Sequence, residues 1–291
     1  MSFSPPVSVV IPNHNGVRLL EKNLPAVFKS LRAGDELVLI DDASTDESVL
    51  WIKTKFNCQQ IPSFFSETEL WQGSNSKITL KLLVNLKNRR FGMSCNRGVE
   101  VATHDYIFLL NSDVVPQSDV LTPLLAHFDP EKNGDLVFGV GCLEVDSTDN
   151  TSQAGKQQLW FERGLFFHSK ASNFNSGETA WVTGGSGLFS KSKWLAIGGF
   201  NAIYYPAYWE DIDLSFQARK RGWKVLFEAK ARVEHNHETT NQTIFGQKKI
   251  AEMSWRNAKK FTWRNGNFWQ KLAFLLWQPY WWWKYQAMAI T

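Results

Sequence analysis

Seven amide and carboxylate side chains of this 291-residue chain each stand at the end of an apolar run. Asn13 and Asn15 follow VSVVI, Asp41 and Asp42 end ELVLIDD, Asn85 and Asn88 follow ITLKLLV, and Asp113 follows YIFLL. Such runs predict buried parallel strands, whose carboxyl ends share the sheet edge at which open α/β folds bind ligands. Amides suit a base and ribose, and a carboxylate suits a divalent cation, so we predict a nucleotide site. For Asp113 taken alone, the alternative is a residue that only begins a turn or caps a helix.

A second group of acids places three carboxylates within four residues, at Glu210, Asp211 and Asp213. Repulsion between like charges raises the pKa of one member toward the range in which a carboxylate acts as a general base. On a helix Asp211 and Asp213 point apart, so only one of them faces a crevice easily. The alternative is that these acids only open a helix, whose N-terminal dipole favours negative charge.

The composition is that of a folded protein with an unusual C-terminal part. Hydrophobic residues make up 43% and charged residues 21% of the chain, which carries a net charge of +4. From Gly246 onward eight Lys and Arg stand against one Glu, so this part carries +7 and the preceding 245 residues carry −3. Six of the fourteen tryptophans lie in the last 29 residues. Because the main part is not basic, we expect no nucleic-acid partner.

The cysteines and the apolar segments bear on location. Cys58, Cys95 and Cys142 are odd in number and far apart, so we expect reduced thiols. The N-terminus lacks the basic segment of a signal peptide, and no stretch approaches the ~20 apolar residues of a spanning helix. We therefore predict a cytoplasmic protein that is soluble or peripheral on the inner face of the membrane.

The first half of the chain alternates between strand and helix patterns, which predicts βαβ units and a mostly parallel sheet. Strands are predicted at Val7–Ile11, Glu36–Ile40, Ile78–Val84 and Tyr106–Leu110. Helices are predicted at Gly16–Leu31, from a capping box at Ser44–Glu47 to Lys55, at Gly92–Ala102 and at Val120–Phe128. The polar stretch Asn57–Ser76 is interpreted as an inserted loop.

The second half has a less regular pattern. A strand is predicted at Val137–Val145, a polar loop at Asp146–Gln158, and an aromatic, glycine-rich stretch without helical period at Trp160–Phe189. Helices at Lys191–Ile197 and Glu210–Arg221 precede an outer strand at Trp223–Glu234, and the chain looks helical from Thr243. We therefore divide it into residues 1–240, with halves at 1–115 and 116–240, and a C-terminal extension at 241–291.

Six segments in a fixed order resemble family 2 of the inverting glycosyltransferases, which use nucleotide sugars and have the GT-A fold. They are SVVIPNHNG, LVLIDDASTD, NRRFGMSCNRGV, YIFLLNSDV, GGFNAIYYPAYWEDIDLSFQARKRGW and ARVEH. The resemblance covers roughly residues 7–237 and is greatest to the branch that builds bacterial cell-surface polysaccharides, which includes rhamnosyltransferases. It implies transfer from a nucleotide-diphosphate sugar to a hydroxyl of a glycan or lipid-linked acceptor, with Mn²⁺ or Mg²⁺.

The resemblance also assigns roles in donor binding. Asp42 corresponds to the aspartate that binds the base or ribose, and Asp113 to the last aspartate of the D-x-D element, which ligates the cation. The remaining donor-side positions are Pro12, Asn15, Asn88, Gly92, Asn96 and Ser112. Two positions depart from the family pattern: His14 replaces the usual tyrosine, and Asn111 replaces the first aspartate of D-x-D. One carboxylate is therefore missing, which shifts cation binding toward other ligands.

On the acceptor side, the resemblance assigns Asp211 as the general base. Glu210 lies beside it, and the segment WVTGGSGL, with Gly184 and Gly185, brings backbone close to the sugar. Trp209 stacks on a sugar face in one interpretation and belongs to the apolar core in the other.

A histidine near the end of the last predicted strand is the second candidate cation ligand. His235 contacts the cation or the diphosphate if the resemblance holds, and is only a surface residue otherwise. His237 lies two residues further on and is a spare candidate.

The C-terminal segment FWQKLAFLL at Phe268–Leu276, with Trp281, Trp282 and Trp283, is amphipathic, aromatic and flanked by lysines. This is the composition of a helix that lies in a membrane interface. The alternative is a contact between subunits or within the chain.

Other functions are less favoured by the sequence. No G-x-G-x-x-G follows the first strand and no P-loop is found, which counts against NAD enzymes and P-loop NTPases. A nucleotide-sugar pyrophosphorylase needs a glycine-rich loop after the first strand, and PNHNG does not supply one. A non-catalytic sugar-binding protein of this fold is disfavoured because Asp42, Asp113 and Asp211 are all present.

Overall fold

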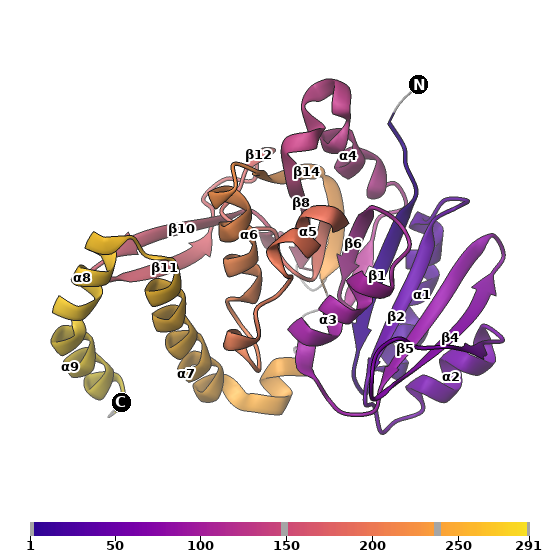
Figure 1. Cartoon of the computed structure of the whole chain (residues 1–291), viewed down its shortest axis with the longest axis horizontal. Coiled ribbons are helices and arrows are strands. Elements are labelled where there is room, and N and C mark those ends of the chain that lie inside the picture. Colours follow the sequence, from indigo (N-terminus) through magenta and orange to yellow (C-terminus); the bar gives the residue numbers. More distant parts are fainter. Residues whose placement is uncertain (1–2, 147–150, 236–239, 290–291) are drawn as a thin grey trace.

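The computed structural model describes residues 3–146, 151–235 and 240–289. Within them, a central sheet has the strand order β12-β14-β8-β13-β6-β1-β2-β5-β4-β3; in addition, β7 (Val114–Pro116) pairs with β14, and β9 pairs with β8. Helices cover both faces of this sheet, and the C-terminal helices extend the molecule at one end (Figure 1). His237, the spare ligand candidate, lies outside the described residues.

The four strands predicted in the first half are confirmed. They are β1 (Val7–Asn13), β2 (Glu36–Asp42), β5 (Ile78–Asn85) and β6 (Tyr106–Leu110). β1 pairs in parallel with β2 and β6, and β2 pairs in parallel with β5. Their apolar side chains are buried on both faces. The polar residues after each strand therefore meet at one sheet edge, as predicted.

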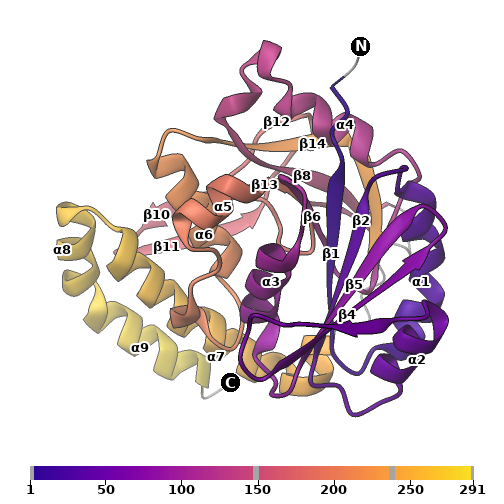
Figure 2. The ribbon, with the colours of Figure 1, turned by 45° about the vertical axis from the view of Figure 1, so that its right-hand side comes forward.

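Two layers of helices bury these strands, and successive residues of a strand face opposite layers. Val9 and Ile11 pack in the cluster that contains α1 (Val17–Ser30), α2 (Ser48–Lys55) and α4 (Leu121–Leu125). Val10 packs in the cluster that contains α3 (Arg90–Val101). Figure 2 shows α3 on one side of these strands and α1 and α2 on the other.

Two helix predictions need correction. The capping box at Ser44–Glu47 does not form, because α2 begins at Ser48 and the Asp46 carboxylate accepts the Ser48 N–H at 3.0 Å. The Ser44 hydroxyl instead donates to Asp41 at 2.6 Å. The helix predicted at Val120–Phe128 is α helical only over α4 and continues as a 3₁₀ turn at Ala126–Phe128.

The interpretation of Asn57–Ser76 as a loop is wrong. This stretch contains β3 (Gln59–Ile61) and β4 (Thr68–Asn75), which continue the sheet antiparallel to β5. Leu70 is the one buried side chain of β4, and the others of that strand are partly or fully exposed. A strand that is mostly exposed, such as β4, lacks the apolar run by which a central strand is predicted.

The second half adds strands around β6. β8 (Val137–Asp146) and the helices α5 (Lys191–Ile197) and α6 (Glu210–Lys220) agree with the predictions. β14 (Lys224–His235) is not an outer strand, since it lies between β8 and β12 (Gly177–Glu178). The predicted irregular stretch contains the β10–β11 hairpin (Gln157–Glu162 and Leu165–Lys170) and β13 (Ser186–Ser190). The polar-loop prediction holds only in part, because β9 (Gln153–Ala154) pairs with β8 and β10 begins at Gln157.

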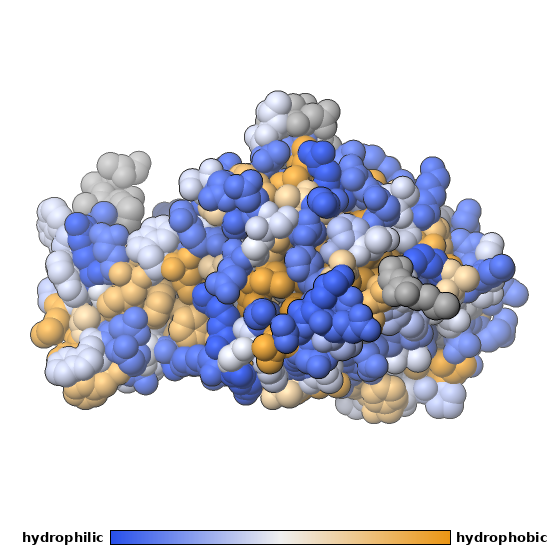
Figure 3. All heavy atoms as spheres, turned by 90° about the horizontal axis from the view of Figure 1, so that it is seen from above, coloured by the Kyte–Doolittle hydropathy of each residue, from blue (hydrophilic) through white to orange (hydrophobic). Residues whose placement is uncertain are grey.

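The C-terminal part is helical, as predicted, and consists of α7 (Thr240–Asn265), α8 (Phe268–Leu276) and α9 (Gln278–Ala289). Ala258 and Phe261 of α7 pack in one apolar cluster with Trp209 and Phe166. α7 therefore contacts the acceptor half closely, and the domain boundary at 240 stays a prediction. Hydrophobic side chains reach the surface at the end that carries these helices (Figure 3).

Of the helices that the structure describes, none is both long and apolar enough to cross a bilayer. The three cysteines are buried free thiols, in agreement with the prediction.

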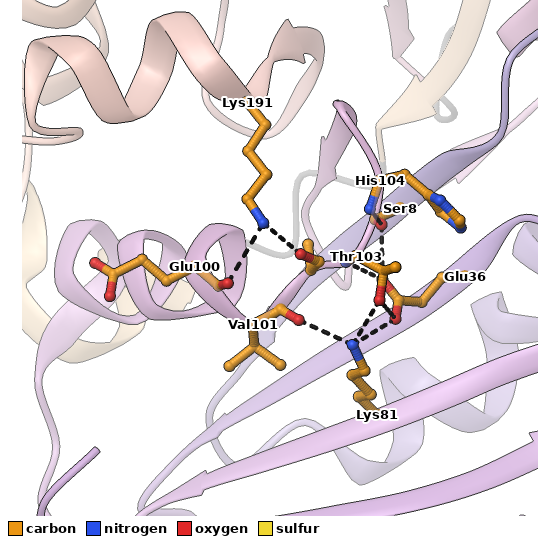
Figure 4. A network of polar contacts seen from close by, with 9 residues as sticks. Ser8, Glu36, Lys81, Glu100, Val101, Thr103, His104 and Lys191 are labelled. Atoms are coloured by element: carbon orange, nitrogen blue, oxygen red, sulfur yellow. Dashed lines mark hydrogen bonds and ion pairs between the residues drawn. The ribbon is translucent and has the colours of Figure 1, made fainter. Parts of the chain in front are cut away.

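A buried polar network ties together the amino ends of the parallel strands, opposite the candidate site (Figure 4). The Glu36 carboxylate accepts hydrogen bonds from the Ser8 hydroxyl and the Thr103 N–H, and pairs with Lys81 at 2.8 Å. Burial alone would raise the pKa of Glu36, but these donors outweigh it and lower the pKa. Because every oxygen has a partner, the network serves the structure rather than chemistry.

Candidate active site

The carboxyl ends of β1 and β2 are joined by hydrogen bonds between their own polar residues. Asn13 donates to Asp41 at 3.0 Å, and the Asn15 side-chain oxygen accepts the Thr45 N–H at 2.7 Å. Asn15 has a positive φ of 52°, which this loop contact stabilises. Pro12 is partly exposed, between the buried residues Ile11 and Asn13 of β1. Asn13, Asn15 and Asp41 therefore fix the shape of this edge.

The Asp42 carboxylate is buried and hydrogen-bonded to neighbouring residues of the chain. This carboxylate, 5% exposed, accepts the Asn85 amide at 3.0 Å and the Arg89 and Arg90 N–H groups at 2.8 Å each. Asp42 thus fixes the loop that begins α3, and its contact with a base or ribose stays a prediction. His14 lies next to it, with Nδ1 2.9 Å from the Asp42 carbonyl oxygen and both ring nitrogens 3.4 Å from the Asn88 amide.

Gly92 and Asn96 join α3 to the segment before α6. The Asn96 side-chain amide donates to the Phe200 carbonyl at 2.9 Å and accepts the Phe200 N–H at 2.8 Å. Gly92 lies against the Phe200 ring and lines a small pocket with Arg90 and Glu210. In this conformation Asn96 is a structural bridge, so its direct contact with a nucleotide stays a prediction.

Asp113 and His235 come together at the centre of the sheet edge, as a cation site requires. Asp113 Oδ2 lies 3.5 Å from His235 Nε2, and each side chain is less than 20% exposed. Two donors ~2.1 Å from one cation lie roughly 3.0–3.6 Å apart, so this separation fits shared ligation of a divalent ion. Among the described residues, no three His, Cys, Asp or Glu side chains are placed to hold a metal together. Further ligands would have to come from water, a bound molecule or other oxygen atoms.

Glu144 on β8 lies next to the ring nitrogen of His235 that faces away from Asp113. Its Oε2 lies 3.6 Å from His235 Nδ1, and its other oxygen accepts the Ser186 hydroxyl. Burial alone would lower the pKa of His235, but the Asp113 and Glu144 carboxylates outweigh it and raise the pKa to about 10. A carboxylate on the second ring nitrogen is the usual way to orient a metal-binding histidine.

A glycine pair connects the Asp113 loop to α6. The Asn111 N–H donates to the Gly185 carbonyl at 2.9 Å, and the Gly184 N–H donates to the Asp211 carboxylate at 3.4 Å. A Cβ atom at position 185 would lie 2.5 Å from the Asn111 side-chain nitrogen, so a larger residue there would displace the Asn111 side chain. The Ser112 carbonyl is held by the Asn23 amide of α1 at 2.8 Å. The structure thus brings the predicted D-x-D and acceptor segments together.

Glu210 and Asp211, the two acids at the start of α6, are buried, and their pKa values are raised above those of exposed carboxylates. Burial raises the pKa of Asp211 to about 6, although the Ile212 and Gly184 N–H groups oppose the shift. Burial, followed by the charge of Asp211, raises the pKa of Glu210 to about 8. Glu210 Oε2 is buried and has no hydrogen-bond partner among the described atoms. Glu210 therefore holds a proton to a higher pH than Asp211 does.

The third acid of this group points elsewhere. Asp213 is 2% exposed, accepts the Asn265 amide at 2.6 Å and lies 3.4 Å from Arg264 Nε. Its contacts hold α6 against the end of α7. Asp211 and Asp213 thus face different surroundings, in agreement with the helical spacing.

Trp209 is a packed residue, so the interpretation as a sugar platform is wrong for this conformation. It is 4% exposed, and its ring packs against His168 and Phe261 with centroids 4.9 and 5.1 Å apart. Tyr208 and Trp209 both have positive φ, of 75° and 78°, immediately before the acids. Such strain persists only where surrounding contacts maintain it. Asn257 of α7 supplies them, because its amide donates to the carbonyls of residues 204, 207 and 208 at 2.9–3.0 Å.

Sequence reasoning missed Glu144 and Asn257. Glu144 stands in the apolar run VFGVGCLEVD, and a single acid in a buried strand indicates a charged partner, so the sequence did contain a signal for it. Asn257 stands in the helical segment WRNAKK, in which nothing distinguishes it from a solvated polar residue.

Comparisons with known proteins agree with this geometry. The family model described as "Glycosyl transferase family 2" matches residues 8–193. The poly-beta-1,6-N-acetyl-D-glucosamine synthase of Staphylococcus aureus (strain COL) is 23% identical over 223 residues, which are 76% of this chain. Those residues cover 48% of the synthase, so this chain spans about half the length of that relative.

Two solved structures share the fold. GalNAc-T7 with UDP, GalNAc and Mn²⁺ has a TM-score of 0.58 at 18% identity, over 80% of this chain and 44% of that one. The mannosyltransferase PcManGT from Pyrobaculum calidifontis, in complex with GDP-Man and Mn²⁺, has a TM-score of 0.60 at 16% identity, over 91% and 66%. The chain therefore has the GT-A fold and belongs to glycosyl transferase family 2.

Proposed function

We propose that this chain transfers a sugar, with inversion, from a nucleotide-diphosphate sugar to a hydroxyl group of a glycan or lipid-linked acceptor. The observation that carries the proposal is the backbone connection from Asn111 through Gly184 and Gly185 to Asp211. It joins the Asp113–His235 pair at one end to a buried carboxylate with a raised pKa at the other. Inversion at an anomeric carbon needs both: a stabilised leaving group and a base for the incoming hydroxyl.

On the donor side, Asp113 and His235 would hold Mn²⁺ or Mg²⁺, with Glu144 orienting the histidine. When bound, such a cation neutralises the charge that develops on a leaving diphosphate. The two GT-A structures named above hold Mn²⁺ with UDP or GDP-Man, which supports the cation for this chain as well.

On the acceptor side, Asp211 takes the proton of the attacking hydroxyl. Its burial makes it a stronger base than an ordinary aspartate, and the Gly184 and Ile212 N–H groups hold its oxygens in place. Glu210 remains protonated beside it and supplies no second negative charge at neutral pH. We assign the chemistry to Asp211 alone.

The wider role in our proposal is synthesis of a cell-surface polysaccharide in the cytoplasm, at the inner face of a membrane. The similarity to a poly-beta-1,6-N-acetyl-D-glucosamine synthase supports a polysaccharide product. The finer resemblance to rhamnosyltransferases and the division of the chain at residue 240 remain predictions.

Product analysis tests the transfer directly. The full chain is incubated with a panel of nucleotide sugars, an acceptor mixture and Mn²⁺, and the released nucleotide is identified. Release of nucleoside diphosphate supports the proposal. In a second mixture, which contains nucleoside triphosphates and sugar phosphates, release of pyrophosphate would favour a pyrophosphorylase. Donor binding with no release under any acceptor would favour a sugar-binding protein.

The pH dependence separates Asp211 from Glu210. Because the pKa of Asp211 is about 6, kcat/KM should rise tenfold per pH unit below that pH and level off above it. Glu210→Gln should leave this rising limb in place, since Glu210 is already neutral there. The measurement is kcat/KM from about pH 5 to pH 9 for both proteins. Loss of turnover in Glu210→Gln, with a wild-type limb near pH 8, would make Glu210 the base instead.

A further inference from the structure

The C-terminal helices expose more large apolar side chains than any other part that the structure describes. Every residue of α8 is partly or fully exposed. The exposed side chains, between 38 and 72% accessible, are Trp263, Phe268, Trp269, Leu272, Leu275, Leu276, Trp277, Trp282 and Trp283. α8 is nonetheless a well-defined helix, begun by a capping box in which Asn267 and Gln270 bond each other's N–H. A folded helix that leaves so much apolar surface in water indicates a partner surface.

The β10–β11 hairpin belongs to the same surface. Trp281 of α9 is 8% exposed, packs on Phe167 of β11 with centroids 5.5 Å apart, and donates its indole N–H to the Arg163 carbonyl at 2.7 Å. Gly164 at the hairpin turn has a φ of 78°, and a Cβ atom there would lie 2.7 Å from the Ala273 carbonyl of α8. The hairpin thus fixes the helices, while Trp160 on it is 40% exposed. We call α8, α9 and this hairpin the terminal face.

The charged residues of the helices at the terminal face are all basic. After Glu252 the sequence has six Lys and Arg and no acid. Lys271 lies 5.7 Å from the Trp263 ring, and Lys284 lies 5.7 Å from the Trp281 ring. Apolar side chains interleaved with cations match the headgroup region of a bilayer that contains anionic lipid.

We propose that the terminal face docks on the surface of an anionic lipid bilayer, with α8 and α9 lying in its interface. The helices have nine and twelve residues, too few to cross a bilayer and long enough to lie along one. A second copy of the chain fits less well, because a symmetric contact through this face would bring Lys271 and Lys284 of both copies together. This inference goes beyond the sugar transfer and does not depend on it.

Three consecutive tryptophans provide the test. Trp282 and Trp283 are 68 and 65% exposed, whereas Trp281 is buried, so Trp282→Ser with Trp283→Ser removes lipid contacts and leaves the core intact. The full chain is sedimented with vesicles of equal parts phosphatidylglycerol and phosphatidylcholine. The double variant should bind these vesicles roughly 10²-fold more weakly than the wild type. Its thermal unfolding temperature should not change.

A matched control comes from the opposite end of the molecule. Phe64 is 69% exposed in the nucleotide half, so Phe64→Ser removes an equally accessible aromatic ring and should leave vesicle binding unchanged. The charge is tested separately: Lys271→Gln with Lys284→Gln should weaken binding to the anionic vesicles about tenfold and leave the weak binding to pure phosphatidylcholine unaltered.

Three results would overturn the proposal. The first is that the full chain sediments no better with anionic vesicles than alone at low salt. The second is that the tryptophan variant binds the vesicles as the wild type does. The third is twice the monomer mass in light scattering for the wild type and the monomer mass for the tryptophan variant, without vesicle binding, which would assign the terminal face to a second copy. Since the experiment contains no substrate, none of these results bears on the transfer reaction.

Discussion

Asp211→Asn is expected to lower kcat by about 10²–10⁴-fold while the Kd of the nucleotide sugar stays nearly constant. The Gly184 and Ile212 N–H groups bond different oxygens of Asp211, so the amide, which has nearly the size of the carboxylate, can accept only one of these two bonds; the loss of one bond should leave the fold in place. The amide cannot take a proton from the acceptor hydroxyl. Turnover under donor saturation and calorimetric titration of the donor, both with Mn²⁺, measure the two quantities.

Asp213→Asn is the control for that variant. It removes the same charge from the same turn of α6, but its carboxylate contacts Asn265 and Arg264 rather than the glycine pair. Provided that it folds, as judged by circular dichroism, its kcat should stay within about tenfold of the wild type. An equal loss of donor affinity in Asp211→Asn would place Asp211 on the donor or the cation, and the assignment as base would be withdrawn.

The parallel half of the fold was predictable because its signals are local. Central strands such as β1 and β6 are buried on both faces and show as continuous apolar runs. Their parallel arrangement then places the following residues at one edge, which is why the sequence alone could identify Asp113. β4 gave no such signal, because a strand with only one buried side chain has the composition of a loop.

The partners of the site residues were not predictable from the sequence. Asp42 and Asn96 stand where the family places donor contacts, yet their polar atoms bond the backbone of Arg89, Arg90 and Phe200. Such contacts join residues 47 to 104 positions apart, and no local pattern records them. The same holds for Trp209: whether a tryptophan stacks on a sugar or packs on α7 depends on how a helix about 50 residues later returns to it.

The pairing of Glu144 with His235 has the same long-range origin, and it explains how the site accommodates Asn111. With one carboxylate absent from the D-x-D element, the second carboxylate of the site arrives from β8 and acts through the histidine. Glu144 faces Nδ1, while Asp113 faces Nε2, so the two acids lie on opposite sides of the ring. Cation binding should therefore depend strongly on Asp113 and less strongly on Glu144.

Asp113→Ala should abolish the effect of the cation on nucleoside diphosphate binding, because it removes the one carboxylate that faces the shared position with His235. In the wild type, EDTA should weaken binding of the diphosphate, whereas in the variant the Kd with Mn²⁺ should equal the Kd with EDTA. Glu144→Gln should retain a cation response with an affinity lowered about 10–100-fold, the usual cost of losing a partner that orients a ligand. Calorimetry with and without EDTA measures all three proteins.

Two further variants show whether these effects are specific. Asp119→Ala removes an exposed acid six residues beyond Asp113 and should respond to Mn²⁺ as the wild type does. Glu228→Gln is matched to Glu144→Gln, because Glu228 is equally buried, accepts a serine hydroxyl at 2.8 Å and lies 2.7 Å from a histidine, His127. That pair involves none of the site residues, so its loss should leave the cation response unchanged. An undiminished response in Asp113→Ala would remove Asp113 from the cation site and assign the cation to other ligands.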